Sequence, residues 1–219
     1  MKFKENAVVI KTIVTSDFGA EIARAHGAGV LETLTGFKYI GEQIDILKEA
    51  GGTFIFGYEE SYGYLTGEHA RDKDAVVSAM LICELSSVLK SEGKTLIDAL
   101  EDLYKKHGYY LDALDSFTLK GETGKARILE VMSYFRLHVR DAFPDIEEVL
   151  DYKNGINGLP KSDVLKFYFK DSSWVAVRPS GTEPKIKFYY SMRAANEPDA
   201  IMKLAALRNV IGTYMKDCL

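Results

Sequence analysis

The sequence predicts an α/β domain followed by an α+β domain, and two patterns lead to this prediction. In the first half, short runs rich in Val and Ile alternate with segments of helical periodicity. This alternation requires crossover connections and implies a largely parallel sheet covered by helices. In the second half, short strand-like runs follow one another through brief loops, which favours antiparallel pairing.

The first half contains regularly spaced elements with recognisable caps. Thr15 or Ser16 is a candidate cap for the first helix, Asp72 or Asp74 for the third and Thr95 for the fourth. The expected strands are 7–14, 30–34 and 53–56, and the expected helices are 17–26, 40–50, 74–90 and 95–107. The helix at 74–90 carries apolar residues at helical spacing: Val76, Val77, Met80, Leu81, Leu85, Val88 and Leu89.

The pattern changes after an extended run at 109–119, which leads into a glycine-rich break at 121–124. We place the domain boundary there and expect domains at 1–118 and 119–219. The elements expected in the second domain are a helix at 122–140, strands at 148–152, 164–169, 174–178 and 185–192, and a last helix capped by Asn196.

The overall charge and the cysteine count exclude several classes of function. A formal net charge of -4 and the lack of a basic stripe argue against partners such as nucleic acid or an anionic membrane. The two cysteines, Cys83 and Cys218, are too few for a disulfide framework and have no metal-ligand spacing. No apolar run near the N-terminus is long enough for a signal peptide or a membrane span, so we expect a cytoplasmic protein without a metal site of its own.

A loop at 178–187 has the residues of a phosphate-binding site. Arg178 can donate two N–H groups to phosphate oxygens, the hydroxyls of Ser180 and Thr182 can add two further donors, and Gly181 permits a backbone anion nest. Lys185 and Lys187, two residues apart in a strand, place both ammonium groups on one face, with Ile186 and Phe188 toward the core. The pattern alone also fits a Pro-Gly turn beside two solvated lysines.

A second loop, Gly57 to Tyr64, follows the third strand, where parallel sheets place their ligands. Glu59 and Ser61 lie two residues apart and would project to the same side of an extended loop. A carboxylate and a hydroxyl suit the recognition of sugar hydroxyl groups. A solvated acidic turn is the alternative.

Three basic residues, His69, Arg71 and Lys73, alternate at spacing two before the third helix and could line a site. The alternative is that Asp72 or Asp74 caps the helix while the three bases are solvated.

These motifs, in this order and separation, resemble the C-terminal half of the α-D-phosphohexomutases, the phosphoglucomutase and phosphomannomutase family. The two main motifs are Gly57-Tyr-Glu-Glu-Ser-Tyr-Gly63 and Arg178-Pro-Ser-Gly-Thr-Glu-Pro184. The segments 12–16, 35–38 and 71–74 also resemble signatures of that family's third domain. The resemblance covers essentially the whole chain and implies a three-layer α/β/α domain followed by a smaller TATA-box-binding-protein-like domain with an antiparallel sheet and flanking helices.

The resemblance also implies roles for individual residues. Glu59 and Ser61 would bind the sugar hydroxyls, and the loop of Thr35 and Gly36 would lie over the sugar. Lys73 would lie near the reacting phosphate and assist catalysis. The phosphate that is not transferred would be held by Arg178, Ser180, Gly181 and Thr182, with Lys187 where many members have an arginine. Tyr58 departs from the family, in which many members have a smaller residue.

A larger departure is that neither a Ser-His-Asn-Pro motif nor an Asp-Gly-Asp-Gly-Asp motif occurs in the chain. The family has four domains, and these motifs supply the phosphoserine and the Mg²⁺ site in the first two. We therefore expect a C-terminal fragment of an enzyme, an isomerase acting by intramolecular phosphotransfer, that interconverts hexose 1-phosphate and hexose 6-phosphate through glucose 1,6-bisphosphate. The fragment alone is expected to be inactive, its partners being sugar phosphates and the missing N-terminal domains.

Phosphoglucomutase is the favoured activity, and phosphomannomutase is the alternative because the sequence does not settle the sugar. Two other classes stay open: a sugar-phosphate-binding module without catalytic domains, and a nucleic-acid binder suggested only by the fold of the last domain. The net charge of -4 argues against the nucleic-acid binder.

Overall fold

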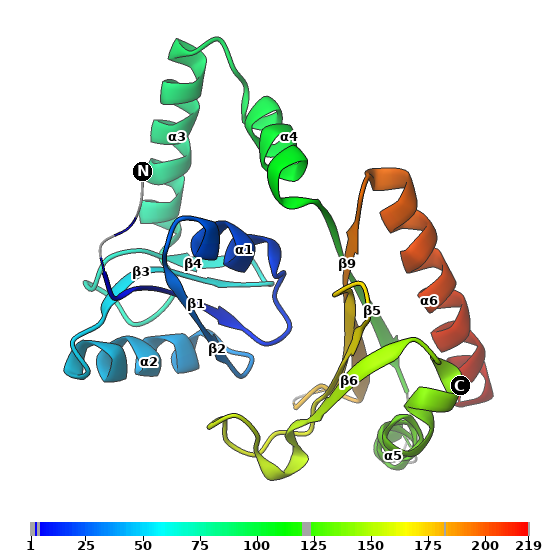
Figure 1. Ribbon diagram of the computed structural model, residues 1–219. Helices are drawn as coiled ribbons and strands as arrows, with labels where there is room; N and C mark the ends of the chain where they lie inside the picture. The colour runs from blue at the N-terminus through cyan, green and yellow to red at the C-terminus, as the bar shows by residue number, and fades with distance from the viewer. Residues whose placement is uncertain (1–2, 4, 120–123, 182, 219) are drawn as a thin grey trace. The chain divides into compact units, whose positions relative to one another are not determined.

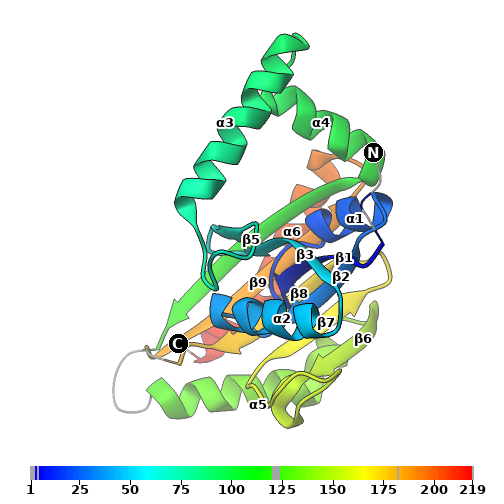
Figure 2. The ribbon, with the colours of Figure 1, turned by 90° about the vertical axis from the view of Figure 1, so that its left-hand side faces the viewer.

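The computed structural model describes residues 3, 5–119, 124–181 and 183–218. The chain divides into two compact units, Met1–Gly108 and Tyr109–Leu219, each with its own sheet (Figures 1 and 2). The expected glycine-rich break at 121–124 lies almost wholly outside the described residues, as does Thr182.

The first unit contains the largely parallel sheet that the sequence predicts. Its strand order is β2-β1-β3-β4, with β1 (Ala7–Thr12) parallel to both β2 (Gly29–Thr33) and β3 (Thr53–Glu59). The short strand β4 (Gly63–Leu65) is antiparallel to β3. This pairing extends β3 to Glu59, so the expectation of a loop from Gly57 to Tyr64 is wrong.

Helices cover both faces of this sheet because alternate residues of β1 point to opposite sides. Ile10 packs with α2 (Phe37–Glu49) in an apolar cluster that includes Ile40 and Ile44. Ala7 and Val9 point the other way and pack with Ala23 of α1 (Phe18–Ala25). The α/β/α arrangement expected for the first domain is therefore confirmed.

The remaining helices of the first unit are α3 (Ala75–Ser91) and α4 (Leu96–His107). Asp74 caps α3, since its carboxylate accepts from the N–H groups of the second and third helical residues at 2.9 and 3.0 Å. Thr95 begins α4 with a capping box. At the first helix Asp17 stands at the N-cap but its side chain makes no capping hydrogen bond; of the two expected candidates, Ser16 accepts from the N–H of Phe18 at 3.3 Å, while the Thr15 hydroxyl bonds elsewhere.

Helix α3 buries much less apolar surface than its sequence predicts. Leu89 is its only residue that is buried, while Val76 and Met80 are 80% and 59% exposed. A helix that is apolar on most sides is usually enclosed by other elements. In this chain α3 contacts mainly β4 and α4.

The second unit is an antiparallel sheet with strand order β5-β9-β8-β7-β6. Its strands are β5 (Tyr109–Thr118), β6 (Ile146–Asp151), β7 (Leu165–Phe169), β8 (Trp174–Pro179) and β9 (Lys185–Ala194), and a short 3₁₀ helix η1 (Tyr152–Asn154) follows β6. The expected antiparallel pairing is confirmed. Strand β9 alternates as predicted, with Ile186 and Phe188 fully buried and Lys185 and Lys187 half-buried.

Two long helices, α5 (Gly124–Ala142) and α6 (Glu197–Cys218), flank this sheet (Figure 1). Their apolar residues form one core with the strands, in which Phe135 of α5 meets Phe188 of β9 at a ring-centroid distance of 5.5 Å. Asn196 accepts from the N–H of Asp199 at 3.0 Å, as expected for the residue that caps α6.

The division between the units comes before β5 rather than after it. The boundary that we placed after residue 118 assigned the run from Tyr109 to the first domain, whereas β5 pairs along its whole length with β9, from Tyr109↔Ala194 to Thr118↔Lys185. An extended run beside a glycine-rich segment gives no indication of which sheet it joins.

This pairing predicts how the second unit behaves when it is produced alone. A chain of residues 109–219 should unfold in one cooperative thermal transition, whereas a chain of 119–219 should not, because removing β5 turns the largely buried strand β9 into an exposed edge. Circular dichroism melting of the two chains provides the test. Equal cooperativity would show that β5 is dispensable and that the boundary at 118 is adequate.

Candidate functional site

The carboxyl end of β3 brings together three of the residues singled out in the sequence. Glu59, 6% exposed, accepts a hydrogen bond from the hydroxyl of Ser61 at 2.8 Å. The Lys73 ammonium lies 3.5 Å from the same carboxylate oxygen. Glu59, Ser61 and Lys73 therefore form one polar group, which we call the β3-end cluster.

The loop of Thr35 and Gly36 directly precedes Phe37, a residue that lies near this cluster. Gly36 has φ +117° and ψ 128°, a conformation that favours glycine, and it stands directly before α2. The first residue of that helix, Phe37, has its ring centroid 5.9 Å from the Lys73 ammonium. Thus the loop and the cluster are linked through Phe37.

His69 and Arg71 do not join Lys73 at the cluster. The His69 ring bonds the Asp74 carboxylate at 2.9 Å, and this hydrogen bond lowers the pKa of Asp74. Arg71 binds Asp45 on α2 at 2.8 Å, which lowers the pKa of that carboxyl. The three bases differ in direction because the segment is not a strand, so spacing two does not place them on one face.

Tyr58 points to the opposite face of the sheet from Glu59. Its hydroxyl donates to the carbonyl of Ser16 at 3.1 Å, and a side chain at Gly19 would meet that hydroxyl at 2.7 Å. The bulk that distinguishes this position from the family pattern is therefore packed against α1, away from the β3-end cluster.

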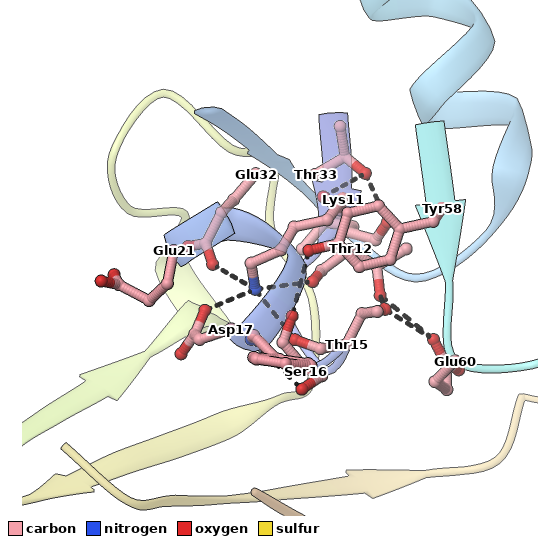
Figure 3. Close-up of polar contacts among 12 residues, drawn as sticks. Lys11, Thr12, Thr15, Ser16, Asp17, Glu21, Glu32, Thr33, Tyr58 and Glu60 are labelled. Atoms are coloured by element: carbon pink, nitrogen blue, oxygen red, sulfur yellow. Dashed lines mark hydrogen bonds and ion pairs between the residues drawn. The ribbon is translucent and has the colours of Figure 1, made fainter. Parts of the chain in front are cut away.

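A buried lysine near this edge of the sheet was not recognised as a site residue from the sequence. Lys11 is fully buried, and its ammonium lies 2.9 Å from Asp17, 2.8 Å from Glu32 and 2.9 Å from the carbonyl of Thr15 (Figure 3). Burial alone would lower the pKa of Lys11, but the two carboxylates outweigh it and the pKa is raised. The sequence does contain one indication of this buried ion group, a lysine within an otherwise apolar strand.

Glu60, next to Glu59, belongs to a separate group of contacts that the sequence did not indicate. Its carboxylate lies 3.1 Å from the Thr12 hydroxyl and 3.3 Å from the Thr15 hydroxyl, which are 2.6 Å from each other (Figure 3). These bonds tie the turn after β3 to the end of β1.

Gly63 leaves the space that Glu59 occupies. A Cβ atom at Gly63 would lie 2.7 Å from a carboxylate oxygen of Glu59 and 2.8 Å from its Cγ. We predict that Gly63→Ala displaces the Glu59 side chain and destabilises the chain by about 1–3 kcal/mol. Thermal unfolding and a crystal structure of the variant are the measurements.

Gly29→Ala is the matched control, because a Cβ at that strand position meets its nearest atom at 3.6 Å, an ordinary contact. The explanation fails if both variants are equally stable and Glu59 keeps its place in the Gly63 variant.

In the second unit, Arg178 at the end of β8 stands directly opposite Lys187 on β9. Both side chains are half-buried and leave the sheet on the face opposite to the apolar core residues Val177 and Phe188. Neither cation has an ion pair with another described residue. Like charges at opposing positions destabilise a strand pair, and a bound anion would remove that repulsion.

The loop between these strands is partly closed by its own bonds. The Ser180 N–H donates to the carbonyl of Lys185 at 2.8 Å, so the expected nest of free N–H groups does not include Ser180. The Lys185 ammonium lies 3.0 Å from both carboxylate oxygens of Glu183, which neutralises it. Gly181 has no atom within 4 Å of the position that a Cβ would take, so its surroundings on that side are open.

A cavity of about 280 Å³ lies beside this loop. It is bounded by loop residues and by the start of α5, with Lys125, Ile128, Leu129, Pro179, Ser180, Gly181, Glu183 and Pro184 in its wall.

The described part of the chain offers neither a metal centre nor a membrane span. Within it, no group of three or more His, Cys, Asp or Glu side chains could hold a metal ion. None of the helices found there is long and apolar enough to cross a bilayer.

Comparison with known families agrees with the two-unit structure. Residues 1–107 match the phosphoglucomutase/phosphomannomutase α/β/α domain III, and residues 89–206 match the C-terminal domain of the same family. The chain belongs to the phosphoglucomutase/phosphomannomutase family. The resemblance inferred from the motifs is therefore confirmed.

Curated relatives with the name phosphoglucomutase are considerably longer than this chain. The protein from Staphylococcus aureus strain RF122 is 40% identical over 214 residues, which are 91% of this chain and 38% of the relative. The Staphylococcus haemolyticus protein is 37% identical over 204 residues, which are 87% of this chain and 37% of the relative. The chain therefore spans somewhat more than a third of the length of these relatives.

Solved structures share the fold at low sequence identity. The open form of parafusin, a phosphoglucomutase from Paramecium, matches with a TM-score of 0.70 at 19% identity over 92% of this chain and 37% of its own. A phosphoglucomutase/phosphomannomutase family protein from Burkholderia thailandensis matches with a TM-score of 0.60 at 14% identity over 95% of this chain and 38% of its own.

Proposed function

We propose that this chain is the sugar-phosphate-binding C-terminal part of a phosphohexomutase that interconverts hexose 1-phosphate and hexose 6-phosphate. The observation that carries the proposal is the β3-end cluster, in which Glu59, Ser61 and Lys73 meet at the carboxyl edge of a parallel sheet. Ligands of such sheets are bound at that edge. The favoured activity is phosphoglucomutase, because the curated relatives that are 37–40% identical carry that name, and phosphomannomutase is the alternative.

In the proposed reaction the first unit recognises the sugar. The Glu59 carboxylate accepts hydrogen bonds from ring hydroxyls, and the Ser61 hydroxyl can donate or accept. Lys73 supplies a positive charge beside them and is the candidate to stabilise charge on the reacting phosphate. Thr35 and Gly36 contribute the loop that lies over the sugar.

The second unit holds the phosphate that is not being transferred. Arg178 and Lys187 provide two opposed cations, while Gly181 offers open backbone. Ser180 adds its hydroxyl and is a ligand rather than the nucleophile. The role proposed for Thr182 rests on the motif alone, since that residue lies outside the described ranges.

Phosphoryl transfer itself is assigned to the N-terminal domains of the parent enzyme. A phosphoserine there would donate its phosphoryl group to give glucose 1,6-bisphosphate, which then turns over and returns the other phosphoryl group. Mg²⁺, for which the described residues offer no ligand set, would supply electrostatic stabilisation of the transferring group in those domains. The binding loops of this chain suit both orientations because each recognises a general feature of the sugar phosphate.

The partners proposed for this chain are therefore sugar phosphates and the N-terminal domains of the parent, in the cytoplasm. A module that binds sugar phosphates without ever being joined to catalytic domains is the second candidate. The matched domain descriptions, which cover the last two domains of a mutase family, favour the first.

The assignment of chemistry to other domains predicts that the purified 219-residue chain does not convert glucose 1-phosphate to glucose 6-phosphate. A coupled assay with Mg²⁺ and glucose 1,6-bisphosphate should give no rate above background. Addition of the N-terminal domains as a separate polypeptide should restore turnover. Turnover by the 219-residue chain alone would contradict this division of labour.

The phosphate role of Arg178 predicts weaker binding when its charge is removed. In a calorimetric titration with glucose 1,6-bisphosphate, Arg178→Ala should raise the dissociation constant by about tenfold or more, since a charged hydrogen bond contributes more than a neutral one. Arg24→Ala is the control, because Arg24 forms only an exposed pair with Glu21 at 2.7 Å. Equal affinities of the two variants would remove Arg178 from the site.

A further inference from the structure

We propose that Glu60 is a positioning residue that holds Glu59 and Ser61 in place by anchoring the turn after β3 to the end of β1. The effect on sugar binding rests on the proposed function, whereas the anchoring of the turn by Glu60 can be tested separately. Glu60 is not one of the residues that the sequence motifs singled out as a ligand.

Adjacent residues at the end of β3 have different tasks. The Glu59 carboxylate contacts the Ser61 hydroxyl at 2.8 Å and the Lys73 ammonium at 3.5 Å. The Glu60 carboxylate turns instead to the hydroxyls of Thr12 and Thr15 (Figure 3). The Glu60 carboxylate is therefore used for attachment, while the Glu59 carboxylate belongs to the β3-end cluster.

The β3–β4 pairing closes the turn, but the side chain at its tip adds no packing. Between Glu59 and Gly63, which pair directly, the chain reverses within three residues. One of them, Tyr62, adopts φ +62°, an unfavourable conformation for a residue with a Cβ, and its side chain is 86% exposed. Packing of Tyr62 therefore cannot hold the turn.

The two threonine hydroxyls form a polarised pair that suits a carboxylate. The hydroxyl oxygens of Thr12 and Thr15 lie 2.6 Å from each other, and 3.1 and 3.3 Å from the Glu60 carboxylate. The two hydroxyl protons are shared among these three contacts. One hydroxyl can donate to the other, whose own proton then points at Glu60. Hydrogen bonds in such a chain reinforce one another, and a charged acceptor strengthens them further.

The support behind the threonines is rigid. The ammonium of Lys11 binds the carbonyl of Thr15 and also joins Asp17, before α1, to Glu32 on β2. Ile13, between the threonines, is fully buried, and its N–H donates to the carbonyl of Thr33 at 2.8 Å. The threonines that hold the Glu60 turn are thus fixed through β1, β2 and the segment that leads into α1.

The inference is tested on the 219-residue chain with Glu60→Ala, Glu60→Gln and the double variant Thr12→Val with Thr15→Val. Two properties are measured: the ¹H–¹⁵N NMR signals of Ser61, Tyr62 and Gly63, and the affinity for glucose 1,6-bisphosphate. Glu49→Ala, at the exposed end of α2, is the matched control.

We expect Glu60→Ala and the double threonine variant to shift or broaden the three turn signals and to weaken binding by about tenfold, as loss of a charged hydrogen bond implies. Glu60→Gln, which keeps an acceptor oxygen, should rescue most of the signal positions. Combining Glu60→Ala with the threonine changes should add little, because both remove the same bonds.

Unchanged turn signals in Glu60→Ala, or fully additive effects of the glutamate and threonine changes, would overturn the inference. If the parent chain does not bind the bisphosphate while the turn signals respond as expected, the proposed sugar site fails and the anchoring by Glu60 stands. If a global loss of melting temperature accompanies equal shifts throughout the first unit, Glu60 has a general structural role and the positioning inference is rejected.

Discussion

The first unit depends on the burial of one positive charge, the ammonium of Lys11. Removing an ammonium from water costs several kcal/mol, and here the cost is offset by Asp17, Glu32 and a backbone carbonyl. Thr15 and Asp17 lie in the short segment between β1 and α1, and Glu32 lies on β2, so one ammonium ion joins the end of β1 and the start of α1 to the neighbouring strand. The edge of the sheet that carries the β3-end cluster is built on that junction.

Most of the secondary structure could be predicted because it follows from local periodicity and capping chemistry. The alternation at Ile186 and Phe188, the capping carboxylate of Asp74 and the capping box at Thr95 need only neighbouring residues. Two features depended on distant partners and were missed. Because β5 pairs with β9, the domain division lies before residue 109 and not after 118. Because β3 pairs with β4, β3 continues to Glu59.

The candidate site divides in the same way. The sequence indicated that Glu59 and Ser61 share one side, and the chain brings them into contact. It could not indicate that Glu183 neutralises Lys185. Nor could it indicate that Asp74 pairs with His69 and Asp45 with Arg71, because the spacing of basic residues does not show which carboxylates the fold brings next to them. The motifs indicated which residues are candidates for binding, whereas the contacts of Glu60 with Thr12 and Thr15 are recognised only from the structure.

Two opposed cations, Arg178 on β8 and Lys187 on β9, would couple anion binding to the stability of the second unit. Arg178 and Lys187 are like charges at opposing positions of neighbouring strands, an arrangement that costs electrostatic free energy and that a bound dianion would relieve. A ligand that binds only the folded form stabilises it in proportion to the logarithm of its concentration. The melting temperature of this unit should therefore follow the concentration of any dianion that settles between the two strands, inorganic phosphate and sulfate included, and a buffer salt would act as a thermodynamic stabiliser.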